Sequence, residues 1–201
     1  FIGYPVIEDN LDSGDSAAFR ERHNLGDKRF ICMMPGSRKG ELKRMLPVFK
    51  KVSKLLNEQM VIIAADNMKL ALEAATLRWP IKPIIVENTE KLDCFAACDA
   101  GIIKSGTAGL EFAFAEKPYV IAYKVNPISA YMLRRMIRVS YVNLVNVLLD
   151  KEVIPELLQE DCEAEYIAEN LIEAIKDRDE QVTDCGKAIK MLYPEGDKSP
   201  S

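Results

Sequence analysis

This sequence has almost no histidine and no excess of basic charge. It has a single histidine, His23, among 201 residues, and its net charge is −4 at pH 7. Proteins that hold nucleic acid normally carry a basic surplus, so we expect no nucleic-acid partner. No apolar run approaches the roughly 18 residues that cross a bilayer, so we expect no membrane-spanning segment. We also expect no signal peptide, and a chain that opens at Phe1 rather than Met suggests a piece of a longer protein.

The cysteines support neither a disulfide framework nor a metal site. Their number is odd, at five. Cys94 and Cys98 share a helical face, but a metal would need further ligands and His23 is distant in sequence. We expect no metal site and buried, reduced thiols, which fits a cytoplasmic protein.

Two common nucleotide-binding fingerprints, G-x-G-x-x-G and G-x-x-x-x-G-K-[ST], are also missing, which disfavours a dehydrogenase or an ATPase. What the chain has is a regular alternation of apolar runs and helical patterns. Strands are predicted at 30–34, 60–65, 84–87, 100–104 and 119–123, and helices at 40–57, 67–77, 89–97, 107–116, 128–139 and 163–176. The alternation predicts an α/β fold with a doubly wound parallel sheet.

The first predicted strand ends at a small, basic turn that contains Gly36, Ser37 and Arg38 and leads into a helix. Free N–H groups and the helix dipole suit such a turn to a phosphate or diphosphate. Arg38 can add two hydrogen bonds to phosphate oxygens. The alternative is that Gly36 and Ser37 only turn the chain and that Arg38 is solvated, and the turn alone leaves both interpretations open.

A second turn of this kind, Ser105-Gly106-Thr107, follows the strand at 100–104 and opens another helix. Glu111 lies one turn into that helix and can accept two hydrogen bonds from a ribose diol. Taken alone, Glu111 is better explained as a partner of its own helix dipole. Together, the two turns and Glu111 predict a pocket for a nucleotide diphosphate, and a nucleotide sugar is the ligand class that remains.

Several motifs then follow one another along the chain: Phe1–Pro5, Pro35–Glu41, Ser105–Glu111, Ala122–Pro127, Tyr141–Asn146 and Val153–Gln159. This series resembles the C-terminal half of bacterial lipid-A-disaccharide synthases, which are two-domain GT-B glycosyltransferases. The resemblance runs from Phe1 to about Lys176 and implies a Rossmann-like domain. It implies three segments, namely an interdomain connection at 1–29, a nucleotide-sugar-binding domain at 30–180, and a C-terminal helix and tail at 181–201.

The resemblance also implies the reaction, which is transfer of diacylglucosamine from UDP-2,3-diacylglucosamine to 2,3-diacylglucosamine 1-phosphate. UDP is released, and neither a metal nor a cofactor takes part. The donor-binding residues that it implies are Gly36, Ser37 and Arg38 on the diphosphate, Ser105, Gly106 and Thr107 in the same cleft, Glu111 on the ribose, and Asn146 and Glu156 facing the cleft. An asparagine that caps a turn is the alternative for Asn146.

No catalytic residue is expected in this chain, because the resemblance places the general base and the acceptor site in an N-terminal domain that is missing here. His23 lies in a polar stretch and is expected on the surface. The arginine-rich segment at 126–138 is expected to pack on a neighbour, with contact to an anionic inner-membrane leaflet as the alternative. Two other function classes stay open: a stand-alone nucleotide-binding module, and another UDP-N-acetylglucosamine transferase or epimerase.

Overall fold

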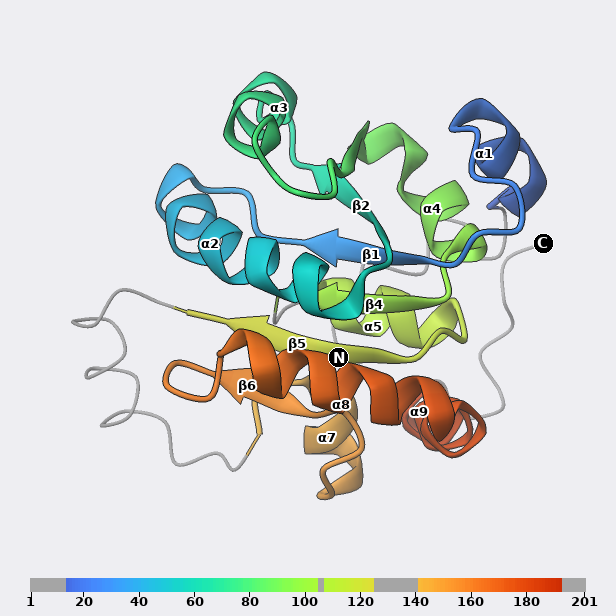
Figure 1. The fold of residues 1–201 in the computed structure, drawn as a ribbon. Helices are drawn as coiled ribbons and strands as arrows, with labels where there is room; N and C mark the ends of the chain where they lie inside the picture. Colours follow the sequence, from blue (N-terminus) through green and yellow to red (C-terminus); the bar gives the residue numbers. More distant parts are fainter. Residues whose placement is uncertain (1–13, 105–106, 125–140, 193–201) are drawn as a thin grey trace.

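A six-stranded parallel sheet runs through the centre of the molecule, with helices on both of its faces (Figure 1). This computed structural model describes residues 14–104, 107–124 and 141–192. The strands lie in the order β3-β2-β1-β4-β5-β6. Their bounds are β1 Phe30–Met34, β2 Gln59–Ala64, β3 Ile84–Glu87, β4 Ala100–Ile103, β5 Tyr119–Tyr123 and β6 Glu156–Leu158. This is the doubly wound order that reverses between β1 and β4, so the predicted fold class is confirmed.

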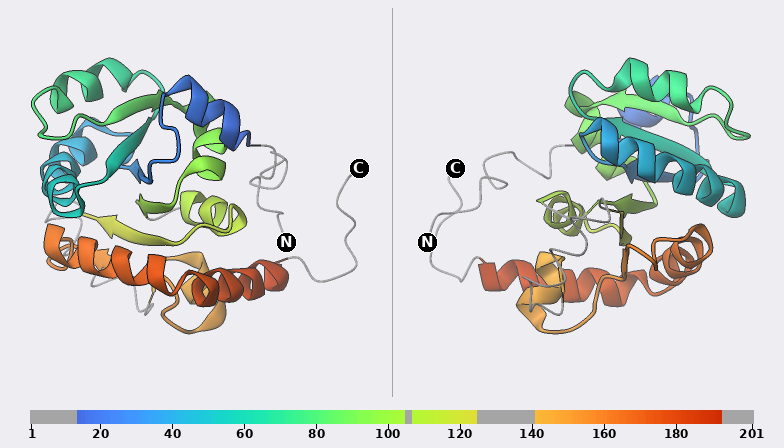
Figure 2. Two further views of the ribbon diagram at one scale, coloured as in Figure 1. Left: turned by 45° about the vertical axis from the view of Figure 1, so that its right-hand side comes forward. Right: turned by 90° about the vertical axis from the view of Figure 1, so that its left-hand side faces the viewer.

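The helices fall into two layers, each with its own apolar core. One core packs α2 (Lys39–Leu56), α3 (Lys69–Thr76) and α8 (Ala164–Lys176) on the sheet. The other lies under α1 (Ser16–Arg22), α4 (Lys91–Ala97), α5 (Thr107–Phe114), α7 (Leu144–Leu149) and α9 (Arg178–Leu192). A short 3-10 helix, η2 (Asn88–Glu90), precedes α4. Figure 2 shows α2 and α8 together on one side of the sheet.

Helix α2 shows why the central elements form where the sequence predicts them. Its buried apolar residues recur at helical spacing and make one stripe that faces the sheet, formed by Leu42, Met45, Val48, Phe49 and Val52. The helix ends at Asn57, whose backbone is left-handed with φ 53°. Asparagine tolerates that conformation better than most residues. The helix therefore has a definite end before β2 begins.

The structure has elements that the sequence did not predict. These are α1, α7 and β6. In addition, α9 begins at Arg178, before residue 181, where the C-terminal helix was expected to begin. Helix α9 thus runs across the division drawn at residue 180, and its Cys185 and Ala188 are buried in the same core as α5. The domain division stays a prediction. The predicted helix at 128–139 lies outside the described residues.

The five cysteines are free and buried, as predicted. Burial raises the pKa of the Cys162 thiol to about 11 and that of Cys185 to about 12. In the described ranges, no helix combines the length and the apolar character that a bilayer crossing requires.

Candidate functional site

The first predicted turn lies at the carboxyl end of β1, beside the strand that precedes the second predicted turn. Strands β1 and β4 are neighbours, with Met34 opposite Ile103, and the Lys104 N–H donates to the Met34 carbonyl over 3.2 Å. The turn at 35–38 and Lys104 therefore lie at the point where the strand order reverses. Ligands of doubly wound sheets bind at this point. In Figure 1 this is the side toward which β1 and β5 point.

The first turn is exposed at Ser37 and Arg38 and continues directly into α2. The N–H groups of Ser37 and Arg38 donate to the Oε2 atom of Glu41 over 3.0 and 3.3 Å, so they point inward. The next two N–H groups, of Lys39 and Gly40, have no hydrogen-bond partner in the described part of the chain. The open donors of this turn are thus the Arg38 side chain and the first N–H groups of α2.

Glu41 itself is almost fully buried, with 2% of its surface exposed. Its Oε1 atom accepts hydrogen bonds from Lys104 Nζ at 2.7 Å and from the Tyr123 hydroxyl at 2.9 Å. Burial alone would raise the pKa of Glu41, but the hydrogen bonds from Lys104, Tyr123 and the Arg38 N–H lower it below its ordinary value. Burial and the bond to Glu41 raise the pKa of Tyr123. Glu41 is therefore a buried carboxylate at the centre of the site.

Glu41, Lys104 and Tyr123 are not among the site residues predicted from the sequence. A local signal existed for one of them. In a capping box, a glutamate at the third position of a helix accepts from the backbone N–H of the residue before the helix. Arg38 and Glu41 have that spacing. No local pattern links Lys104 and Tyr123 to this carboxylate, because they come from the ends of β4 and β5 and meet it only in the folded sheet.

Thr107 begins α5, and Glu111 lies one turn further along this helix. The Glu111 Oε1 atom is 3.0 Å from Lys91 Nζ, and both side chains are largely buried. The Oε2 atom of Glu111 has no hydrogen-bond partner among the described residues, so it could still accept from a ligand. Ser105 and Gly106 lie outside the described residues.

Asn146 and Glu156 are held in contacts away from this turn. Asn146 is fully buried on α7, where its Oδ1 accepts from the N–H groups of Val153 and Ile154. Its Nδ2 donates to the Ile154 carbonyl at 2.7 Å and to Glu156 Oε1 at 3.0 Å. Glu156 also accepts from the N–H groups of Val142 and Asn143, just before α7. These bonds tie α7 to β6, and direct contact of Asn146 with a ligand would require them to break.

Basic side chains surround the carboxyl end of β5. Lys124 Nζ lies 2.7 Å from Glu163 Oε1, and Arg44 Nε donates to the Lys124 carbonyl at 3.0 Å. Arg38 and Lys104 add two further positive charges at the neighbouring strand ends. At the ends of β1, β4 and β5, these four cationic groups outnumber the carboxylates that bond to them, Glu41 and Glu163, which suits an anionic ligand.

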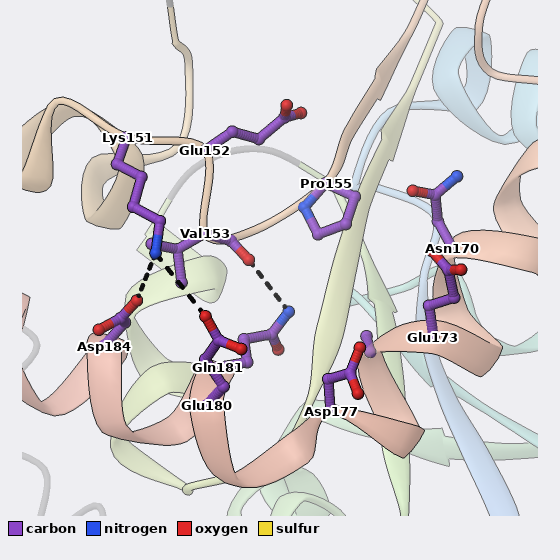
Figure 3. A pocket seen from close by; sticks show the side chains of 11 residues that line it. Lys151, Glu152, Val153, Pro155, Asn170, Glu173, Asp177, Glu180, Gln181 and Asp184 are labelled. Carbon is purple, nitrogen blue, oxygen red and sulfur yellow. Dashed lines mark hydrogen bonds and ion pairs between the residues drawn. The ribbon is translucent and has the colours of Figure 1, made fainter.

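Among the cavities of the described residues, one of about 780 Å³ lies on the outer side of α3 and β3, lined mainly by apolar side chains such as Leu70 and Leu77. Two others lie at opposite ends of the strands. One of about 320 Å³ is formed at the carboxyl ends of β2 and β3, where Asp66, Asn67, Asn88 and Thr89 contribute to its wall. The other, of about 220 Å³, lies between the loop before β6 and helices α8 and α9 (Figure 3). There Lys151 is 3.0 Å from Asp184, and Gln181 donates to the Val153 carbonyl. This cavity lies at the end of the sheet away from the predicted site.

His23 is not the solvated residue that the sequence analysis expects. Its side chain is 17% exposed, and its Nε2 atom lies 2.9 Å from Glu90 Oε2. Its ring also packs on Phe19, with centroids 4.5 Å apart. The histidine therefore helps hold α1 on the rest of the domain. No cluster of acidic, histidine or cysteine side chains in the described ranges is arranged to hold a metal ion.

Comparison with known sequences gives a consistent match. A family model described as lipid-A-disaccharide synthetase matches residues 1–196. The lipid-A-disaccharide synthase of Granulibacter bethesdensis is 44% identical over 175 residues, which are 84% of this chain and 44% of the relative. That of Rhodospirillum centenum is 37% identical over 211 residues, covering 100% of this chain and 52% of the relative. The chain thus spans about half the length of the curated relatives it matches.

Solved structures with the same fold are glycosyltransferases. The E. coli ADP-heptose lipopolysaccharide heptosyltransferase II has a TM-score of 0.55 and 14% identity, over 82% of this chain and 52% of that one. WaaG, a glycosyltransferase involved in lipopolysaccharide biosynthesis, has a TM-score of 0.56 and 13% identity, over 96% and 51%. Identities this low show the fold alone. That fold is the Rossmann-like half of a GT-B glycosyltransferase, as the sequence predicts.

Proposed function

Because this chain belongs to the lipid-A-disaccharide synthase family, we propose that it is the donor-binding part of such a glycosyltransferase. In this proposal it binds UDP-2,3-diacylglucosamine, whose sugar passes to 2,3-diacylglucosamine 1-phosphate with release of UDP. The observation that carries the proposal is the start of α2. It lies where the strand order reverses between β1 and β4, with Arg38 exposed beside it.

The diphosphate would bind at this helix start. Its oxygens would accept from the Arg38 guanidinium and from the N–H groups of Lys39 and Gly40, whose donors are open in the described part of the chain. The α2 dipole adds positive potential at the same point. Gly40 has no side chain, so nothing of its own shields this stretch of backbone. Ser37 and Gly36 would shape the turn rather than donate to the ligand.

The nucleoside would extend along the same edge of the sheet. Glu111 Oε2 would accept from the ribose diol, while Lys91 holds Oε1 in place. The cavity at the ends of β2 and β3, about 320 Å³, is large enough for a pyrimidine base. Its lining residue Thr89 lies two residues before Lys91, so the base and ribose sites would be neighbours.

The lipid acceptor would bind through the half of the enzyme that this chain does not span, and transfer is expected only when that half is joined to it. A cytoplasmic location at the inner membrane and a reaction without metal or cofactor belong to the same proposal. The chain would then act by holding the UDP leaving group, whose developing negative charge Arg38 and the α2 dipole would stabilise.

Binding of UDP and uridine to the wild-type chain tests this proposal. Because hydrogen bonds to charged groups contribute about 1.5–3 kcal/mol each, UDP should bind at least about tenfold more tightly than uridine. Isothermal titration calorimetry measures the UDP affinity, and NMR titration reaches the weaker uridine affinity. Equal affinities would show that no diphosphate site exists at this turn.

A further inference from the structure

Glu41 joins three neighbouring strand ends at the candidate site. Its Oε2 atom accepts from the N–H groups of Ser37 and Arg38, in the turn after β1. Its Oε1 atom accepts from Lys104, just after β4, and from Tyr123, at the end of β5. A single carboxylate thus receives hydrogen bonds from residues at the ends of three adjacent strands, of which β1 and β4 border the place where the strand order reverses.

The turn and this carboxylate fit closely against each other. Gly36 has φ 108°, a conformation that side chains rarely adopt. A Cβ atom at Gly36 would collide with the Glu41 carboxylate, so any other residue here would displace that carboxylate from its donors. The shape of the turn is therefore set by the carboxylate beneath it as well as by the glycine.

Glu41 carries its negative charge at neutral pH. The side chain is almost fully buried, and its donors lower its pKa, so it stays ionised at neutral pH. Lys104 is held by this charge and also lies over the Tyr123 ring, 4.8 Å from its centroid. Removing the charge would release both the turn and the Lys104 ammonium.

We propose that Glu41 is a positioning residue for the nucleotide diphosphate, which it never contacts. It fixes the Arg38 turn and the first N–H groups of α2 relative to β4 and β5. This inference rests on the proposed function and adds the group that keeps the diphosphate donors in place. A merely structural residue would support the fold, whereas Glu41 is expected to affect the phosphate part of the ligand selectively.

An opposite role for the same carboxylate makes an opposite prediction. If Glu41 occupied the phosphate site in place of the ligand, it would have to leave before UDP could bind. Its removal would then strengthen UDP binding. Glu41 is buried and accepts hydrogen bonds from four donors, which favours a fixed carboxylate. A carboxylate that moved out of the site would lose all four hydrogen bonds.

The test measures UDP and uridine affinities for Glu41→Gln, which keeps the size of the side chain and removes its charge. We expect UDP to bind at least about tenfold more weakly, while the uridine affinity changes less than about twofold. Asp184→Asn is the matched control, because Asp184 is also a largely buried carboxylate held by two lysines, Lys151 and Lys187. It lies on α9 and should leave the UDP affinity unchanged.

Tyr123→Phe is a milder second variant in case Glu41→Gln does not fold, since it removes one donor to Glu41 and keeps the charge. It should weaken UDP binding about threefold and leave uridine binding unchanged. UDP affinities equal to or tighter than wild type in these variants would overturn the role of Glu41 alone. A wild-type chain that does not bind UDP would overturn the proposed function and this inference together.

Discussion

Arg38 and Glu41 carry opposite charges three residues apart, and the fold separates their tasks. Arg38 is exposed before the first turn of α2, where it can meet a ligand, while Glu41 is buried beneath that turn. The turn at Gly36, Ser37 and Arg38 was predictable from the sequence, and its role in binding phosphate stays a prediction. The inward direction of the Ser37 and Arg38 N–H groups was not predictable, because it depends on where Glu41 lies in the folded domain.

Glu111 offers a test at the scale of a single residue. Its Oε2 atom is available for the ribose diol, so UDP should bind more tightly than 2′-deoxy-UDP, by about 1–3 kcal/mol. Glu111→Ala should abolish this preference, as measured by calorimetric titration of both nucleotides. Glu58→Ala, which removes a carboxylate paired with Arg29 at the amino end of β1, should keep it. An unchanged ratio in Glu111→Ala would leave Glu111 as a partner of its helix dipole.

At the scale of elements, the sequence predicted five of the six strands, including the edge strand β3, and missed the edge strand β6. Strands such as β2 are apolar along their length and are bounded by turn residues, so they can be recognised locally. Strand β6 has three residues and begins with Glu156, so it carries no apolar run of its own. Helices α1 and α7 are also short, with seven and six residues. Such elements form through tertiary contacts, which local patterns do not reveal.

Asn146 shows how such contacts hold α7 in place. Asn146→Ala would leave the buried Ile154 N–H and the partly buried Val153 N–H without their acceptor, and Glu156 without one donor. We expect the free energy of unfolding to fall by about 2–4 kcal/mol, measured by urea denaturation. UDP affinity should change less than about threefold, since these bonds lie within the protein.

The control for this variant is Asn170→Ala, which removes a half-buried asparagine whose side chain donates to the Tyr166 carbonyl of its own helix in an exposed hydrogen bond. It should change stability by less than about 0.5 kcal/mol, as is usual for surface positions. A loss of UDP affinity beyond tenfold in a folded Asn146→Ala variant would instead support the direct contact that the family resemblance implies for this residue.

At the scale of the whole molecule, two layers of helices hold the strands so that their carboxyl ends form one continuous edge (Figure 1). The turn at Arg38, the buried Glu41, the Lys91–Glu111 pair and the cavity after β2 and β3 all lie along it. The cavity between the loop before β6 and helices α8 and α9 lies at the opposite end of the sheet. One edge thus gathers the groups of the proposed nucleotide-diphosphate site.

The central claim is that this edge holds the diphosphate of UDP at the start of α2. It is tested most directly by calorimetric titration of UDP into wild type, Arg38→Ala and Arg29→Ala. Arg29 is the matched control, because it is an exposed arginine paired with Glu58 at the amino end of β1. We predict that Arg38→Ala weakens UDP binding by about 1.5–3 kcal/mol and that Arg29→Ala leaves it unchanged. Equal UDP affinities for wild type and Arg38→Ala would contradict the claim.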